Sequence, residues 1–74
     1  MITSTIYFLE GALSNAATRS IKGQVYDVPR VGGVAFEVEA GKDTCMILKH
    51  KDDEPIDRTA LEAAVAKAGN YRLL

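Results

Sequence analysis

The stretch GALSNAA, residues 11–17, joins two segments of opposite character, and the rest of the chain follows from this junction. Residues 3–9 before it are rich in Thr, Ile, Tyr and Phe, a composition typical of a β-strand. Beyond it, apolar residues recur at four-residue intervals from Ala17 to Val25, the spacing of one face of an α-helix. The Ser14 hydroxyl can accept a hydrogen bond from a first-turn amide, so we expect Ser14 to cap this helix. The stretch therefore predicts a strand followed at once by a helix.

The middle of the chain indicates a helix end followed by a β-hairpin. Pro29 stops the first helix at about Asp27, because the residue before a proline is driven out of helical geometry. Residues 34–38 alternate between strongly apolar and other side chains, which indicates a half-buried strand. Residues 40–43 are typical of a hairpin turn, and residues 44–50 supply the return strand.

The last third of the chain indicates a second helix and a fourth strand. An apolar stripe at helical spacing predicts a helix that begins at Pro55 or Asp57 and ends just before Gly69, its expected C-cap. Residues 71–74 then form a short last strand. The order β-α-β-β-α-β predicts an α+β fold, the ferredoxin-like sandwich, in which two helices cover one face of a four-stranded antiparallel sheet.

Length and charge restrict the class of protein. The 74 residues suffice for one domain, and 47% hydrophobic with 26% charged residues is ordinary for a globular chain. The chain has nine basic and ten acidic residues, and the basic ones form no stripe along the sequence. We therefore do not expect a nucleic acid as a partner. The longest uncharged run, residues 1–9, is too short to span a membrane and lacks a basic leader. The single Cys45 rules out an internal disulfide, and together these features favour the cytoplasm.

The junction and the segments around it resemble the heavy-metal-associated domain family, which includes small copper and mercury chaperones. That family typically reads Gly-Met-x-Cys-x-x-Cys, followed by apolar residues at four-residue intervals, Leu-Pro-Gly-Val, and Ala-Gly-Tyr near the end. The spacing is kept in this chain by Gly11, Ile21, Val25, Val28, Pro29, Gly69 and Tyr71. The resemblance covers about residues 5–72 and implies one such domain over residues 1–74, with the same ferredoxin-like fold. Arg30 stands where the family has Gly, and Asn70 interrupts the last motif.

The metal loop of the family is degenerate in this chain. In the family two cysteine thiolates bind a soft ion such as Cu(I). Here the two cysteine positions hold Ser14 and Ala17, a hard hydroxyl and a methyl group that cannot ligate. The degenerate loop, with the aromatic residue that the resemblance places beside it, comprises Ala12, Leu13, Ser14, Asn15, Ala16, Ala17 and Tyr71. We therefore expect no metal and no cofactor at this loop.

No other residues form a convincing metal or catalytic site. Cys45 and His50 lie five apart on one predicted strand, so they face opposite ways and lie about 17 Å apart. We expect Cys45 to pack as a small hydrophobic residue, and His50, between two lysines, to lie at the surface. Ser14 has no neighbouring base, and there is no phosphate-binding glycine loop or paired-carboxylate motif. We therefore expect a protein that is not an enzyme.

One strand predicts an uncovered apolar surface. Ile6 and Phe8 alternate with Tyr7 and Leu9, so helices on one side of a sheet cannot bury both pairs. If the helices cover Tyr7 and Leu9, the opposite face shows Ile6 and Phe8, and the hairpin register decides which residues join them. The candidate interaction surface is Ile6, Phe8, Cys45 and Ile47.

Two hypotheses about function follow. The first is a non-enzymatic protein-interaction module, an accessory of a metal-handling system, that binds a protein partner or a second copy of itself. The second is a metal-binding or chaperone protein that holds Cu(I) or another soft ion at an unconventional site, such as two Cys45 thiolates brought together by dimerisation. A third outcome stays open, in which long side chains such as Lys49 and Glu37 cover the apolar patch.

Overall fold

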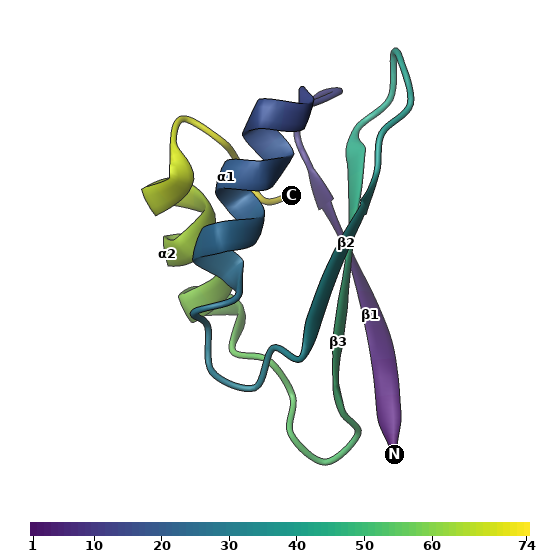
Figure 1. Ribbon diagram of the computed structural model, residues 1–74, viewed down its shortest axis with the longest axis vertical. Helices are drawn as coiled ribbons and strands as arrows, with labels where there is room; N and C mark the ends of the chain where they lie inside the picture. The colour runs from purple at the N-terminus through teal and green to yellow at the C-terminus, as the bar shows by residue number, and fades with distance from the viewer.

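The computed structural model describes all 74 residues and has two helices packed on one face of a three-stranded antiparallel sheet (Figure 1). In chain order the elements are β1 (Ile2–Leu9), α1 (Asn15–Val25), β2 (Gly33–Glu37), β3 (Thr44–Lys51) and α2 (Arg58–Ala68). The strand order is β1-β3-β2, so β3 is central and pairs antiparallel with both neighbours. Each helix has 11 residues, and neither is long and apolar enough to reach across a bilayer.

The fourth strand predicted over residues 71–74 is absent, so the prediction of a four-stranded ferredoxin-like sheet is wrong. The segment makes one isolated bridge, between Leu73 and Leu9, flanked by two backbone hydrogen bonds of 2.8 and 2.9 Å. The pairing cannot continue past Glu10, because Gly11 turns the chain away from the C-terminal segment with a φ of 82°. The observed order is β-α-β-β-α, which is still an α+β fold.

Local chemistry explains where the helices begin and end. The Ser14 hydroxyl accepts a hydrogen bond from the Ala17 amide at 3.1 Å, as expected of an N-cap. Asp57 is the N-cap of α2, since its carboxylate accepts a hydrogen bond from the Thr59 amide at 3.0 Å. α1 ends at Val25, two residues before the predicted Asp27, because the chain tightens into a turn there with bonds between residues three apart.

The core lies between the helices and the facing side of the sheet. α1 contributes the predicted stripe at four-residue intervals, and α2 contributes two residues four apart. The sheet contributes one residue in two from each strand, as the pleat requires. The buried residues that form the core cluster are Leu9, Ile21, Val25, Val28, Val34, Met46, Leu48, Ile56, Leu61, Val65 and Leu73, and Ala17 is buried beside them. Val38, which the alternation predicted to be inward, lies outside β2 and is exposed.

His50 also faces this core, so the prediction that it lies at the surface is wrong. Its position in β3 alternates with Lys49 and Lys51, and the pleat turns it toward the helices while both lysines face outward. Its Nδ1 lies 2.9 Å from the Lys51 carbonyl, to which it must donate, and its Nε2 lies 2.7 Å from the Thr5 hydroxyl. The Nε2 contact joins β3 to β1, whereas the Nδ1 contact lies within β3 and orients the ring.

Thr44, the first residue of β3, holds the junction loop (residues 11–17) in place by hydrogen bonds. Its side chain is fully buried, and its hydroxyl donates to the Gly11 carbonyl at 2.8 Å and accepts from the Leu13 amide at 3.0 Å. The Thr44 amide donates to the same carbonyl at 3.0 Å, and Asp43 accepts the Gly11 amide at 2.9 Å. The conformation of the loop therefore depends on Asp43 and Thr44, which the sequence of the loop itself does not reveal.

Candidate interaction surface

The face of the sheet opposite the helices is covered by no other element (Figure 1). Even-numbered residues of β1 point to this face because its odd-numbered residues turn toward the core. Ile2, Ile6 and Phe8 are 62%, 57% and 50% exposed, respectively. Three large apolar side chains of one strand therefore face solvent, with Ser4 between Ile2 and Ile6.

The strand register determines what lies beside them. Ile6 pairs with Ile47 of β3, and Phe8 pairs with Cys45. On the other side of β3, Ile47 pairs with Ala35. Directly opposed side chains in antiparallel strands lie about 4.5–5.5 Å apart, so these residues make one continuous apolar patch. The open face, as defined from here on, comprises Ile2, Ser4, Ile6, Phe8, Gly33, Ala35, Glu37, Cys45, Ile47, Lys49 and Lys51.

All four residues of the sequence-predicted surface thus share the open face. Ile2 and Ala35 also lie on this face and were not among the predicted residues. Ile2 was open to prediction from the same alternation that singled out Ile6, because the two lie four residues apart on one strand. Ala35 depends on how β2 pairs with β3, which no local pattern reveals.

Charged side chains border the patch without covering it. A Cβ atom added to Gly33 would lie 3.4 Å from Lys49 Cβ and Cδ, so the Lys49 stem packs over β2 and away from the apolar residues of β1. Lys51 lies beside Ile2, and Glu37 lies beside Cys45 at the other end. An apolar centre with a charged border is typical of a protein-binding surface.

The open face continues into a shallow hollow at its β2 side. The hollow has a volume of about 300 Å³ and is lined by Ala35, Ile47, Lys49 and the ring of Tyr26, among others. Tyr26 follows α1 and is exposed, with the Lys22 ammonium 5.9 Å from its ring centre. The open face and the exposed Tyr26 therefore border one hollow.

The degenerate metal loop is a helix start in the structure. Ala12 is exposed before it, and Asn15 and Ala16 form the exposed first turn of α1. Leu13 is half-buried and shares with Tyr71 a hollow of about 430 Å³. The loop and the C-terminal aromatic residue are therefore neighbours in space.

The loop residues do not fit a soft metal ion. The Ser14 hydroxyl already accepts the Ala17 amide, and the Ala17 methyl is buried against the core. Neither supplies a soft donor. No cluster of three or more His, Cys, Asp or Glu side chains occurs in the structure, and Cys45 and His50 lie on opposite faces of β3.

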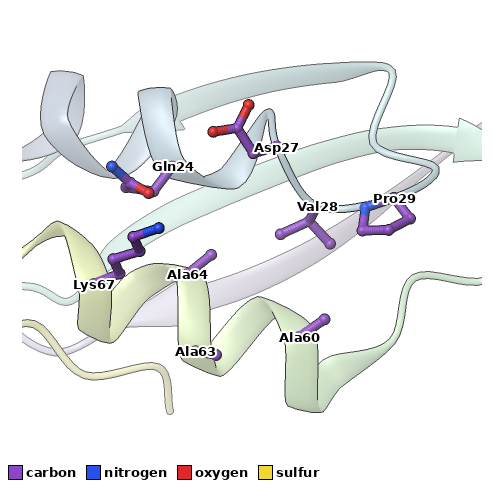
Figure 2. A pocket seen from close by; sticks show the side chains of 8 residues that line it. All are labelled: Gln24, Asp27, Val28, Pro29, Ala60, Ala63, Ala64 and Lys67. Carbon is purple, nitrogen blue, oxygen red and sulfur yellow. The ribbon is translucent and has the colours of Figure 1, made fainter.

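A third hollow, a groove, lies between the end of α1 and the side of α2 (Figure 2). It has a volume of about 290 Å³, and three alanines of α2, Ala60, Ala63 and Ala64, leave the space open. Its charged lining groups are Asp27 and Lys67, one from each side, as Figure 2 shows. This groove was not predicted from the sequence; the closely spaced alanines of α2 are the sequence signal for it.

Comparison with known proteins does not identify a relative of this chain. No family model, curated protein or solved structure matches this chain. The resemblance to heavy-metal-associated domains therefore stays a prediction, and the function has to be argued from the open face itself.

Proposed function

We propose that this protein is a non-enzymatic interaction module that binds a protein partner through the open face, as an accessory of a metal-handling system. One observation carries the proposal: the strand register gathers Ile6, Phe8 and Ile47 on a face that no element covers. The single free Cys45 supports a cytoplasmic location, where thiols stay reduced.

The energetics favour an apolar contact centred on Phe8. Fully burying an Ile or Phe side chain contributes roughly 1.5–3 kcal/mol, and Ile6 and Phe8 are about half exposed. Each therefore offers roughly half of that value to a partner. Phe8 pairs with Cys45, which in turn pairs with Glu37 at the end of the open face. A partner with an apolar centre and a basic group near Glu37 would therefore be complementary.

The link to metal handling rests on the spacing around residues 11–17. That spacing resembles a metal-binding loop, yet Ser14 and Ala17 serve as helix cap and core residue. A domain that keeps the spacing of this loop and lacks the ligands is suited to contact a metal-handling protein without carrying the ion.

Affinity capture with matched variants tests the proposal. Phe8→Ser removes the centre of the open face, whereas Arg19→Ser changes an exposed residue of α1. We expect wild type and Arg19→Ser to capture the same partner and Phe8→Ser to lose it, with circular dichroism confirming that all three are folded. If Phe8→Ser retains every partner of the wild type, the open face is not the binding surface.

A second candidate function is soft-metal binding by two Cys45 thiolates across a face-to-face dimer. The observation that favours it is that Cys45 lies on the open face beside Phe8 and is not fully buried. Anaerobic titration with Cu(I) separates the two functions. This candidate requires one ion per two chains, lost in Cys45→Ala, whereas the interaction module retains no Cu(I) after desalting.

A further inference from the structure

The outer edge of β1 is open along most of its length. β1 pairs with β3 over all of Ile2–Leu9, but on its other side only Leu9 is bridged, by Leu73. From Ile2 to Tyr7 no strand lies along this edge.

The hydrogen bonds of β1 show which residues point their backbone groups to that edge. On the outer side, the Phe8 carbonyl accepts an amide of the C-terminal segment at 2.8 Å, and the Glu10 amide donates to that segment at 2.9 Å. On the inner side, the Met1 carbonyl accepts from the residue after β3 at 3.1 Å. Since backbone groups alternate along a strand, even-numbered residues face outward. Ile2, Ser4 and Ile6 therefore present three amides and three carbonyls to the open edge.

This edge also lacks the features that normally prevent pairing. Proteins protect edge strands with charges, prolines, bulges or a covering segment. Residues 2–9 contain no charged residue, no proline and no glycine. The strand is rich in Ile and Thr, which favour β-pairing.

We propose that the outer edge of β1 pairs with the same edge of a second copy, antiparallel, about a two-fold axis at Ser4. In this register Ser4 faces the second copy's Ser4, and Ile2 faces the second copy's Ile6. The six outward groups of Ile2, Ser4 and Ile6 in each chain then all find partners, giving six backbone hydrogen bonds across the junction.

The neighbouring registers satisfy fewer groups. Centring on Thr5 would set Ile2 opposite Phe8, a place on the edge that Leu74 already occupies through its hydrogen bond to the Phe8 carbonyl. Centring on Thr3 would leave the groups of Ile6 without a partner. The register at Ser4 therefore pairs every outward group of Ile2, Ser4 and Ile6, so a second copy can fill this stretch of the edge completely.

The side chains are compatible with this pairing. On the open face, Ile2 of each copy lies opposite Ile6 of the second copy. On the face toward the helices, Thr3 lies opposite the second copy's Thr5, and no like charges are opposed. The axis is perpendicular to the sheet, so the result is a six-stranded sheet with four helices on one side. The two open faces become one continuous surface, while the two Cys45 residues lie roughly 30 Å apart, by strand rise and strand spacing. This dimer therefore differs from the thiol-bridged one and does not rest on the proposed function.

Light scattering coupled to size exclusion, across a concentration series under reducing conditions, tests the pairing. We expect wild type to approach twice the chain mass of 8.0 kDa. Ser4→Pro removes an outward amide that β3 does not use, and Ser4→Glu sets two carboxylates opposite each other. Both variants should remain at the mass of one chain. Ala35→Glu adds the same charge to β2, away from the edge, and should dimerise as wild type does.

Oxidative cross-linking tests the register. In a Cys45→Ala background, Ser4→Cys should form a disulfide-linked dimer, because its Cα atoms would lie about 5.5 Å apart. Ile6→Cys should not, because its two copies lie roughly 14 Å apart in this register. A wild type that stays monomeric at the highest concentration overturns the proposal. So does a dimer that survives both Ser4→Pro and Ser4→Glu, or equal cross-linking by Ser4→Cys and Ile6→Cys.

Discussion

Replacing Thr44 with valine tests how β3 holds the junction loop. The Thr44 side chain is fully buried and makes two hydrogen bonds, to the Gly11 carbonyl at 2.8 Å and from the Leu13 amide at 3.0 Å. Valine has nearly the same shape, so Thr44→Val removes the hydroxyl without leaving a large cavity. The change therefore isolates the two hydrogen bonds.

The expected cost comes mainly from the Leu13 amide. The Gly11 carbonyl keeps its 3.0 Å bond from the Thr44 amide, whereas the Leu13 amide loses its acceptor in a partly buried place. Leaving a buried donor unpaired costs about 1–3 kcal/mol. For a domain of this size each kcal/mol lowers the melting temperature by roughly 4–8 °C.

Urea unfolding and amide hydrogen exchange measure the effect. The control is Thr3→Val, a half-buried threonine on the same side of the sheet whose hydroxyl makes no hydrogen bond within the chain. We expect Thr3→Val to stay within about 0.5 kcal/mol of wild type. A Thr44→Val protein as stable as wild type, with unchanged exchange at Leu13, would refute this account of the loop.

Three further changes have defined outcomes. Arg30 has a φ of 76°, which strains any residue with a side chain, so Arg30→Gly should raise the free energy of unfolding by about 1 kcal/mol in urea; a fall would contradict this. Leu9→Ala, in the core, should cost about 2–5 kcal/mol, whereas Phe8→Ser, on the open face, should cost far less; equal costs in urea unfolding would contradict the face assignment. Ser14→Cys combined with Ala17→Cys should protect Cu(I) from a competing chelator better than wild type does, and equal protection by wild type would show that the native chain has another site.

The parts of the fold that follow local rules were accessible from the sequence. Ser14 could be identified as a cap because its bond to Ala17 spans only three residues. The two sides of β1 followed from simple alternation, and the helix stripe followed from the 3.6-residue period. These patterns do not depend on partners elsewhere in the chain.

The parts that depend on pairing were not accessible. Residues 71–74 have the composition of a strand, but Gly11 ends their pairing with β1, and composition alone does not show how many of them will pair. His50 was judged by its lysine neighbours, whereas its burial follows from the register of β3. The same register decides that Cys45 joins the candidate surface, and the turn sequence alone does not fix it.

The central claim is that the open face binds a protein partner, and amide chemical-shift mapping tests it most directly. Isotope-labelled protein would be titrated with the partner recovered by affinity capture. We predict that the largest shifts fall on β1 and on the outward residues of β3, with Ile6, Phe8 and Ile47 at the centre. Shifts that instead centre on the groove between α1 and α2, near Ala60 and Lys67, would contradict the account.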